Sequence, residues 1–189
     1  MITPDTLQLD RDRAALLVID IQTRLCTAMH PDRLQLLRRN AVTLIRAARV
    51  LGLPILVTEQ YPKGMGPTLP DLREALPEGQ PIQEKLHFSC CGDDGFTAAL
   101  EETGRDQILV TGMETHVCVF QTARDLARAG RAVYVPQDAV ISRTAENHDI
   151  GLRLLERAGA TRTSTEAALF DLLQVAGTPE FKAIAPLIR

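Results

Sequence analysis

Three residues with complementary chemistry each stand at or just after the end of a strand-like stretch: Asp20, Lys85 and Cys118. Asp20 closes an apolar run that begins at Ala14, and the other two follow later strand-like runs. If these strands are parallel, their carboxyl ends meet at one edge of a sheet, where α/β proteins bind ligands. A carboxylate, an ammonium and a thiol at that edge predict a nucleophilic site.

The role of each group follows from its ordinary chemistry. If Thr115 is the N-cap of the next helix, Cys118 lies in the first turn, where the helix end stabilises a thiolate. Asp20 would accept the thiol proton as a general base. Lys85 would hold Asp20 ionised, lower the pKa of the thiol and polarise negative charge that develops on a substrate. The alternatives are a core cysteine, a loop-capping carboxylate and a solvated surface lysine.

The histidines indicate neither a dyad nor a metal site. His116 is two residues from Cys118, and on a helix such positions do not face each other, so we interpret it as a packing residue. The other histidines show no metal-ligand spacing: His30, His87 and His148. We therefore expect neither a metal nor another cofactor.

Composition restricts the class of protein. The 189 residues are 45% apolar and 24% charged, which predicts one soluble domain over residues 1–189. The net charge of -3 argues against nucleic acid or a membrane surface as partner. The apolar runs are shorter than the roughly 20 residues needed to span a bilayer, and Asp10, Arg11 and Asp12 interrupt any hydrophobic signal region. Three cysteines without CxxC spacing are interpreted as structural thiols of a cytoplasmic protein: Cys26, Cys90 and Cys91.

Strand-like and helix-like segments alternate along the chain. Six strands are predicted at 14–20, 55–57, 81–85, 107–112, 132–135 and 161–164. Helical patterns occupy 34–51, 96–104, 116–129, 145–158 and 166–175. This alternation predicts a three-layer αβα fold with a six-stranded parallel sheet. The Pro- and Gly-rich segment 60–79 is predicted to be a long functional loop with one short helix at 71–75.

Taken together, these motifs resemble the isochorismatase-like cysteine hydrolase superfamily, which includes nicotinamidases and N-carbamoylsarcosine amidase. The resemblance spans nearly the whole chain, and residues 57–64 look most like the isochorismatase domain-containing subgroup. Its carriers are Val18–Gln22, Lys85 with Phe88-Ser89, Gly112–Val119, and Asp138-Ala139 before Ser142-Arg143.

The resemblance implies a Rossmann-like hydrolase fold and a triad of Asp20, Lys85 and Cys118. It also implies a cis peptide between Met113 and Glu114, with the backbone amides of Glu114 and Cys118 forming an oxyanion hole. Residues of the matching motifs and of the adjoining loop are expected to contact a small-molecule substrate: Gln22, Gln60, Tyr61 and Phe88. Metal-binding nicotinamidases carry Asp-x-His after the second strand, where this chain has Glu59-Gln60-Tyr61.

We therefore expect a metal-independent cysteine hydrolase that cleaves a small amide or related C–N bond through an acyl-enzyme. One alternative is vinyl-ether hydrolysis, as in true isochorismatases, which generally lack the cysteine. Another is a catalytically idle interaction module that binds a partner through the 60–79 loop. A homo-oligomer, dimer or tetramer, is also expected, with segment 61–79 at an interface or acting as a lid, because the segment carries four large apolar residues: Met65, Leu69, Leu72 and Leu76.

Overall fold

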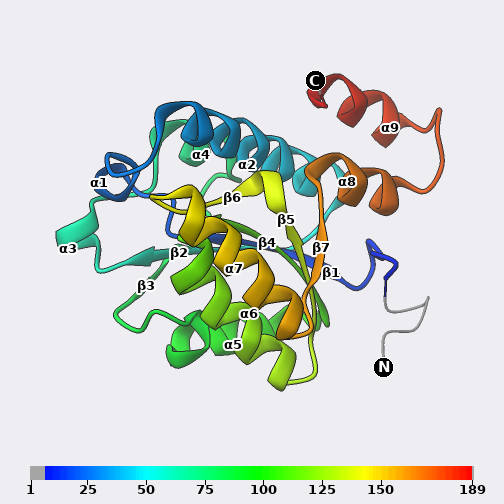
Figure 1. Ribbon diagram of the computed structural model, residues 1–189. Helices are drawn as coiled ribbons and strands as arrows, with labels where there is room; N and C mark the ends of the chain where they lie inside the picture. Colours follow the sequence, from blue (N-terminus) through cyan, green and yellow to red (C-terminus); the bar gives the residue numbers. More distant parts are fainter. Residues whose placement is uncertain (1–6, 189) are drawn as a thin grey trace.

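In the computed structural model, the chain folds into a parallel sheet with helices on both faces (Figure 1). The structure describes residues 7–188. Within those residues the strands follow the order β3-β2-β1-β4-β5-β7, and β6 pairs with β4. Their bounds are β1 Ala14–Ile19, β2 Ile55–Gln60, β3 Gln83–Lys85, β4 Gln107–Met113, β5 Ala132–Pro136, β6 Val140–Ile141 and β7 Thr161–Thr163. The three-layer prediction is confirmed. The described part of the sheet has seven strands rather than six, because β6, only two residues long, was not predicted.

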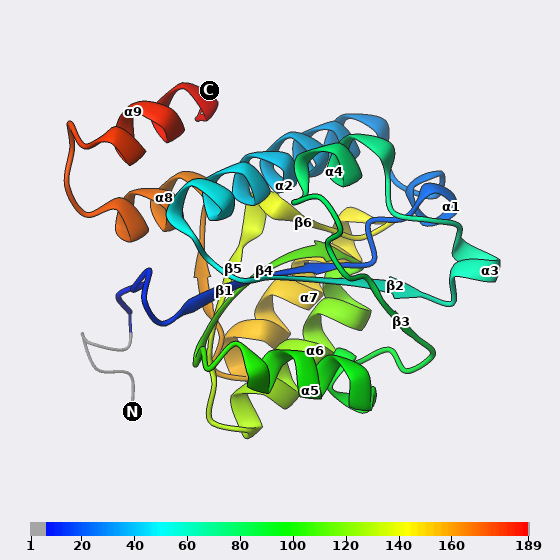
Figure 2. The same cartoon turned by 180° about the vertical axis from the view of Figure 1, so that it is seen from behind.

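The helices divide between the two faces of the sheet. Helices α2, α4 and α8 cover one face, and α5, α6 and α7 cover the other, as Figures 1 and 2 show from opposite sides. The bounds are α1 Thr23–Cys26, α2 Pro31–Leu51, α3 Pro62–Met65, α4 Pro70–Ala75, α5 Asp94–Glu102, α6 Phe120–Arg128, α7 Ala145–Arg157, α8 Thr165–Leu173 and α9 Pro179–Ile184. Among residues 7–188, no helix is long and apolar enough to cross a membrane. The predicted single domain includes residues 1–6 and 189, which lie outside the described residues.

Strand β1 shows why its sequence is continuously apolar. It lies between β2 and β4, and all six of its residues are buried. Successive side chains point to opposite faces of a strand. Accordingly Leu16 and Val18 join the core beneath α2, whereas Leu17 and Ile19 join the core beneath α6. A strand covered on both faces needs apolar residues at every position.

Side-chain caps set the starts of four helices. Asp93, Thr144, Ser164 and Thr178 each accept a hydrogen bond from a backbone amide three residues later, at α5, α7, α8 and α9. Helix α2 ends at Gly52, whose φ of 70° suits a residue without a Cβ. These local signals lie in the sequence, which is why the helix positions could be predicted.

The segment 60–79 is more ordered than the predicted loop. It holds two short helices, α3 and α4, where one was expected. Leu72 and Leu76 are buried in the core beneath α2, and Leu69 packs against it. Because this packing within one chain accounts for their apolar character, these residues give no support to an interface at this segment. The exposed large apolar side chains near the sheet's carboxyl edge are instead Tyr61, Leu86 and Phe88.

Candidate active site

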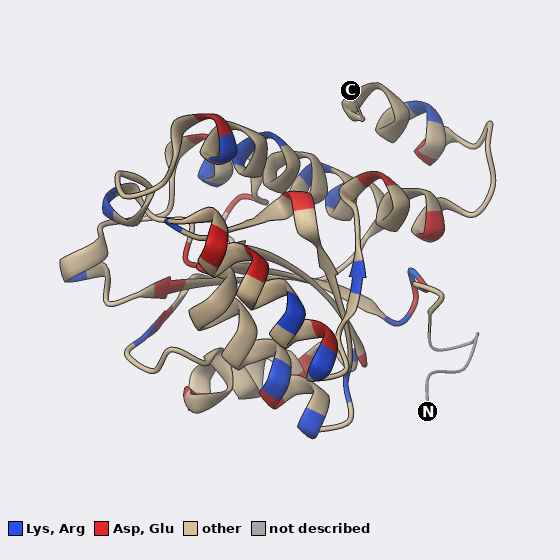
Figure 3. Cartoon of the chain, viewed as in Figure 1, with Lys and Arg blue, Asp and Glu red and all other residues tan. Residues whose placement is uncertain are grey.

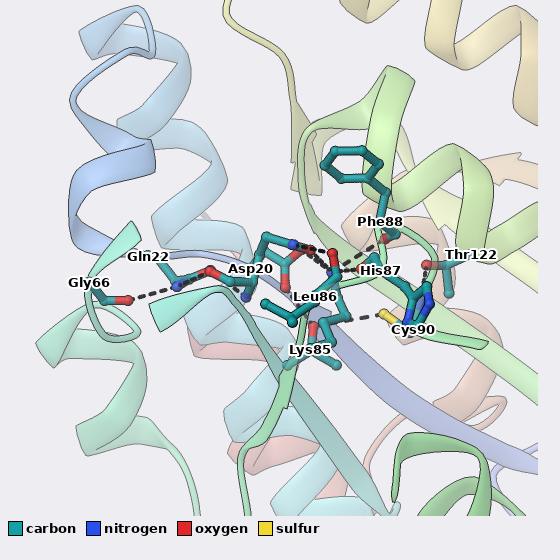
Figure 4. Close-up of polar contacts among 11 residues, drawn as sticks. Asp20, Gln22, Gly66, Lys85, Leu86, His87, Phe88, Cys90 and Thr122 are labelled. Atoms are coloured by element: carbon teal, nitrogen blue, oxygen red, sulfur yellow. Dashed lines mark hydrogen bonds and ion pairs between the residues drawn. The ribbon is translucent and has the colours of Figure 1, made fainter. Parts of the chain in front are cut away.

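The structure brings Asp20, Lys85 and Cys118 together from three different strands. Asp20 directly follows β1, Lys85 is the last residue of β3, and Cys118 lies in a five-residue π-helical segment after β4. All three are nearly inaccessible to solvent, with exposed fractions of 0%, 2% and 6%. Figure 4 shows Asp20 and Lys85 at the centre of a network of polar contacts. The carboxyl edge of the sheet therefore holds a buried cluster of reactive groups.

Lys85 is held by an ion pair and three further acceptors. Its Nζ lies 2.7 Å from Asp20 Oδ2 and donates to Gln60 Oε1 at 2.6 Å. It also donates to the backbone carbonyls of His87 and Phe88, each at 3.3 Å. Burial lowers the pKa of Lys85, but the combined attraction of Asp20, Cys90 and Cys118 outweighs it, so that the net pKa is raised. The ammonium is therefore charged and fixed in place.

The other oxygen of Asp20 is also satisfied. Thr58 in β2 donates its hydroxyl to Asp20 Oδ1 at 2.8 Å. Cys90 Sγ lies 3.8 Å from the same hydroxyl oxygen, and the backbone amide of Cys90 donates to Thr122 Oγ1 at 2.9 Å. Thr58 and Thr122 were not predicted as site residues, and Cys90 was interpreted as structural. The one available signal was a threonine within the apolar run of β2.

The Cys118 thiol lies beside Asp20 and is protonated at rest. Burial raises the pKa of Cys118, the negative charge of Asp20 raises it further, and Lys85 opposes both effects only in part. The net direction is opposite to the lowering expected from Lys85 and the helix end. The reason is that Lys85 is already paired with Asp20, whereas the sulfur is desolvated. The structure therefore places a protonated thiol next to a carboxylate.

The start of the helix after β4 differs from the prediction. Thr115 is not an N-cap, because the segment Thr115–Val119 is a π-helical turn whose first flanking residue is Glu114. The Thr115 hydroxyl instead meets His148 Nδ1 of α7 at 2.9 Å. Helix α7 approaches so closely that a Cβ at Gly151 would lie 2.8 Å from the backbone nitrogen of His116. Contacts with α7 therefore shape the segment that carries Cys118.

The predicted oxyanion residues lie at the junction of β4 and this π-helical segment. The peptide bond between Met113 and Glu114 is cis. The preceding Gly112 has a φ of 141°, and a Cβ there would lie 2.1 Å from the carbonyl oxygen of Ile19 in β1. The Glu114 side chain accepts from the backbone amide of Arg143 at 2.8 Å and pairs with its guanidinium. His116 Nδ1 lies 2.9 Å from Ser142 Oγ, consistent with a packing role.

Two of the predicted substrate contacts are amides that bond to the chain itself. Gln22 is fully buried, and its Nε2 donates to the carbonyls of Gln60 and Gly66 while its Oε1 accepts from the Gln60 amide. The Gln60 side chain accepts from Lys85 and donates to the carbonyl of Leu86. Both amides thus hold the strand ends around the site, as Figure 4 shows for Gln22 and Gly66. A contact of either with substrate stays a prediction.

The other two predicted contacts are exposed aromatic residues. Tyr61 has a φ of 37° directly after β2, and Phe88 is 56% exposed. The Phe88 ring points away from the Asp20–Lys85 pair in Figure 4. A cavity of about 850 Å³ lies between residues 86–92 and α6, with Leu86 and Phe88 in its wall. The segment that supplies two carbonyls to Lys85 therefore also borders open space.

Glu59 occupies the stretch where metal-binding relatives carry Asp-x-His. Its Oε1 accepts from the Thr68 amide at 2.6 Å, the Thr68 hydroxyl at 2.8 Å and Arg73 Nη2 at 2.9 Å. Burial raises the pKa of Glu59, but these donors outweigh it and the net pKa is lowered. Within the described part of the chain, no group of three or more His, Cys, Asp or Glu residues is arranged to hold a metal ion. The Glu59 carboxylate therefore forms an ion pair with Arg73 within the chain.

Comparisons with known proteins point to one family. The Isochorismatase domain family matches residues 14–167. Isochorismatase domain-containing protein 2 of Danio rerio is 36% identical over 149 residues, which are 79% of this chain and 74% of that protein. The structure of MAR1 ribonuclease from Caenorhabditis elegans superposes with a TM-score of 0.89 at 36% identity, covering 96% of this chain and 92% of that one. YcaC from Pseudomonas aeruginosa, solved with hexane-2,5-diol and covalent acrylamide, gives 0.89 at 25% identity over 99% and 93%.

Proposed function

Because the chain belongs to the isochorismatase family, we propose that it is a metal-independent cysteine hydrolase that cleaves a small amide or a related C–N bond. The observation that carries this proposal is the position of the Asp20 carboxylate, which accepts from Lys85 Nζ at 2.7 Å and lies beside the Cys118 thiol. We propose that this carboxylate takes the proton from the nucleophile.

In the first half of the proposed reaction, Cys118 Sγ attacks the substrate carbonyl while its proton moves to Asp20. The carbonyl electron pair moves to oxygen, and the backbone amides of Glu114 and Cys118 are the proposed donors to that oxyanion. When the intermediate collapses, the C–N bond breaks and Asp20 gives its proton to the leaving amine. The product is a thioester on Cys118 with Asp20 ionised again.

In the second half, water attacks the thioester and Asp20 takes a proton from that water. Collapse of the second intermediate breaks the C–S bond, and the proton returns to sulfur to restore the thiol. Lys85 keeps its charge throughout and compensates the negative charge of Asp20. The raised pKa of Cys118 fits this cycle, because free thiolate is disfavoured until Asp20 accepts the proton.

The burial of the cluster supports a small substrate. Exposed fractions of 6% or less at the three reactive residues leave little room for a polymer at the sulfur. Tyr61 and Phe88 are proposed to contact the substrate at the entrance, because both are exposed aromatic residues beside the segments that border the cluster.

Cleavage of RNA enters as an alternative because of the Caenorhabditis elegans relative. An RNA-binding surface is typically a continuous basic patch. In this chain the net charge is -3, and acidic and basic residues are interspersed along the helices of both layers (Figure 3). We therefore place RNA second to small amides, and vinyl-ether hydrolysis and an idle interaction module remain the other two alternatives.

The test is release of ammonia or amine from a panel of small amides and carbamoyl compounds, with vinyl ethers and RNA included. The parent is compared with Cys118→Ala and with Cys26→Ala, which removes a buried thiol elsewhere in the fold. We expect turnover that Cys118→Ala abolishes and Cys26→Ala retains, with a substrate-derived mass on the parent chain when the reaction is quenched early. Full activity of Cys118→Ala on a vinyl ether or RNA would reject the proposal. Absence of turnover, together with slow and uniform labelling of all four cysteines by a thiol-reactive probe, would also reject it.

We also propose that the chain forms a homo-oligomer and works in the cytoplasm. Support for self-association is the exposure of Leu86 and Phe88, at 72% and 56%, beside the catalytic cluster. Support for the cytoplasm is the set of four free cysteines, which suits a reducing compartment.

A further inference from the structure

We propose that Thr58 is a positioning residue for Asp20, and that Cys90 in turn orients the Thr58 hydroxyl. This inference rests on the proposed function, because it concerns how Asp20 is prepared to act as a base. Thr58 was not predicted as a site residue, and Cys90 was interpreted as structural.

The first step is the way in which the carboxylate is held. Thr58 donates to Oδ1 at 2.8 Å, and Lys85 donates to Oδ2 at 2.7 Å. The two donors come from neighbouring strands, β2 and β3, so the carboxylate is held at both oxygens and its plane is fixed. The Asp20 backbone amide also donates to the Thr58 carbonyl at 3.2 Å. Thr58 therefore holds both the main chain and the side chain of Asp20.

The second step is the direction of the Thr58 hydroxyl. A hydroxyl carries one proton, and here it is given to Asp20. The hydroxyl oxygen then has lone pairs left for a donor, and Cys90 Sγ lies 3.8 Å away in the donating position. Burial raises the pKa of Cys90 to about 12, so the sulfur keeps the proton that it donates. The bond between the Cys90 amide and Thr122 anchors this residue to α6.

The third step is what this chain of donors does for the proposed reaction. A carboxylate held at both oxygens cannot turn about the bond that joins it to the rest of the side chain. Without the Thr58 hydroxyl, Asp20 would be free to rotate away from Cys118, and a poorly aligned base slows the reaction of the thiol. Thr58 is fully buried, and its β-branched side chain has few rotamers, which suits such a positioning role.

The experiment measures the reactivity of Cys118 and needs no substrate. Acrylamide is the probe: the sulfur adds to the terminal alkene carbon, and a proton adds to the carbon next to the carbonyl. The rate of Cys118 alkylation is followed by peptide mass across the pH range. Thr58→Val removes the hydroxyl at nearly constant volume, and Thr58→Ser keeps it.

We expect Thr58→Val to shift the whole Cys118 profile to lower alkylation rates, by about tenfold. Thr58→Ser should keep the parent profile. Cys90→Ala should give a smaller shift to lower rates, and Cys90→Ser should keep rates close to those of the parent. The matched control is Thr111→Val in β4, which removes an equally buried hydroxyl that donates to the Ala139 carbonyl at 2.6 Å. That variant should lose stability but keep the parent profile.

Three results would overturn the inference. An unchanged profile in Thr58→Val would show that the hydroxyl does not act on the base. Equal impairment of Thr58→Ser, or an equal shift in Thr111→Val, would show a general packing effect. In each case the proposed function survives if the parent still labels selectively at Cys118. A parent without selective labelling would instead reject the base role of Asp20, and with it both proposals.

Discussion

Replacing Lys85 by Met tests whether the buried ion pair maintains the fold as well as the site. The side chains of Lys85 and Asp20 are both fully buried, and their charged atoms are 2.7 Å apart. Removing one partner of such a pair typically destabilises a protein by about 3–5 kcal/mol, because a desolvated charge is left unpaired. In Lys85→Met, the Asp20 carboxylate keeps the hydrogen bond from Thr58 but has no positive charge beside it. We therefore expect a loss of about 4 kcal/mol in the free energy of unfolding.

The partner variant is Asp20→Asn. Asp20 has a φ of 53°, and Asn is among the residues that adopt this left-handed conformation most readily, so the backbone is preserved. Lys85 then keeps its three neutral acceptors, and we expect a smaller loss of about 2 kcal/mol. In the double variant both charges are gone. The combined loss should be less than the sum of the single losses by at least about 2 kcal/mol.

The assay is urea denaturation at one fixed protein concentration, because self-association would otherwise change the apparent stability. The control is Asp106→Asn, which breaks the ion pair with Arg13 at 2.6 Å, whose side chains are 50% and 47% exposed. Exposed pairs contribute about 1 kcal/mol or less. The reasoning fails if Lys85→Met costs no more than this control, or if the two losses at the buried pair are additive.

Four further outcomes are expected. Cys118→Ala should abolish turnover with an unchanged circular dichroism spectrum, and Cys118→Ser should remain poor because a hydroxyl is harder to ionise than a thiol; substantial activity in either would argue against a thioester. Treatment with a chelator should leave turnover intact, whereas a loss that zinc or iron restores would contradict metal independence. Burial and nearby Arg33 lower the pKa of His148 from 6.5 to about 4. The unfolded chain therefore binds the His148 proton at a higher pH than the folded chain does, and stability is lost as pH falls from 6.5 to about 4. His148→Gln should lose less stability over this range, and a loss equal to that of the parent would contradict the role of His148. Sedimentation at micromolar concentration should give a species heavier than the 20.8 kDa chain, and a stable monomer would remove the oligomer proposal.

The sequence predicted those features that depend on local patterns. A strand buried on both faces needs a continuous apolar run, so the run that ends at Asp20 identified β1 and its functional end together. Helix ends followed from residues such as Gly52 and Thr144, whose geometry is decided within one turn. Strand β6 was missed because two residues, Val140 and Ile141, carry no periodicity.

Features that depend on distant contacts could not be predicted in this way. Thr58 is 38 residues from Asp20 along the chain, and only the sheet register places its hydroxyl against the carboxylate. The pKa of Cys118 is raised because the thiol is buried beside Asp20 and because Lys85, which would lower this pKa, is already paired with Asp20. The Gln22 and Gln60 side chains were expected at the substrate, but their observed bonds are to backbone groups and to Lys85. In each case the residue type indicated what the side chain could do, but its contact partner could not be predicted from the sequence.

Strand β3 carries Lys85 and is also a part of the sheet that is exposed to local opening and to pairing with another chain. It is three residues long, lies at the edge of the sheet and pairs only with β2 among the described strands. A strand this short would open easily in native-state hydrogen exchange, and an edge that opens becomes a template for pairing with another chain. Its last residue is Lys85, which the pair with Asp20 ties to the middle of the sheet. Removing either charge of this pair would therefore loosen the edge as well, so variants at Lys85 or Asp20 should exchange faster at residues 83–85 and aggregate sooner than Cys118→Ala, which keeps the pair.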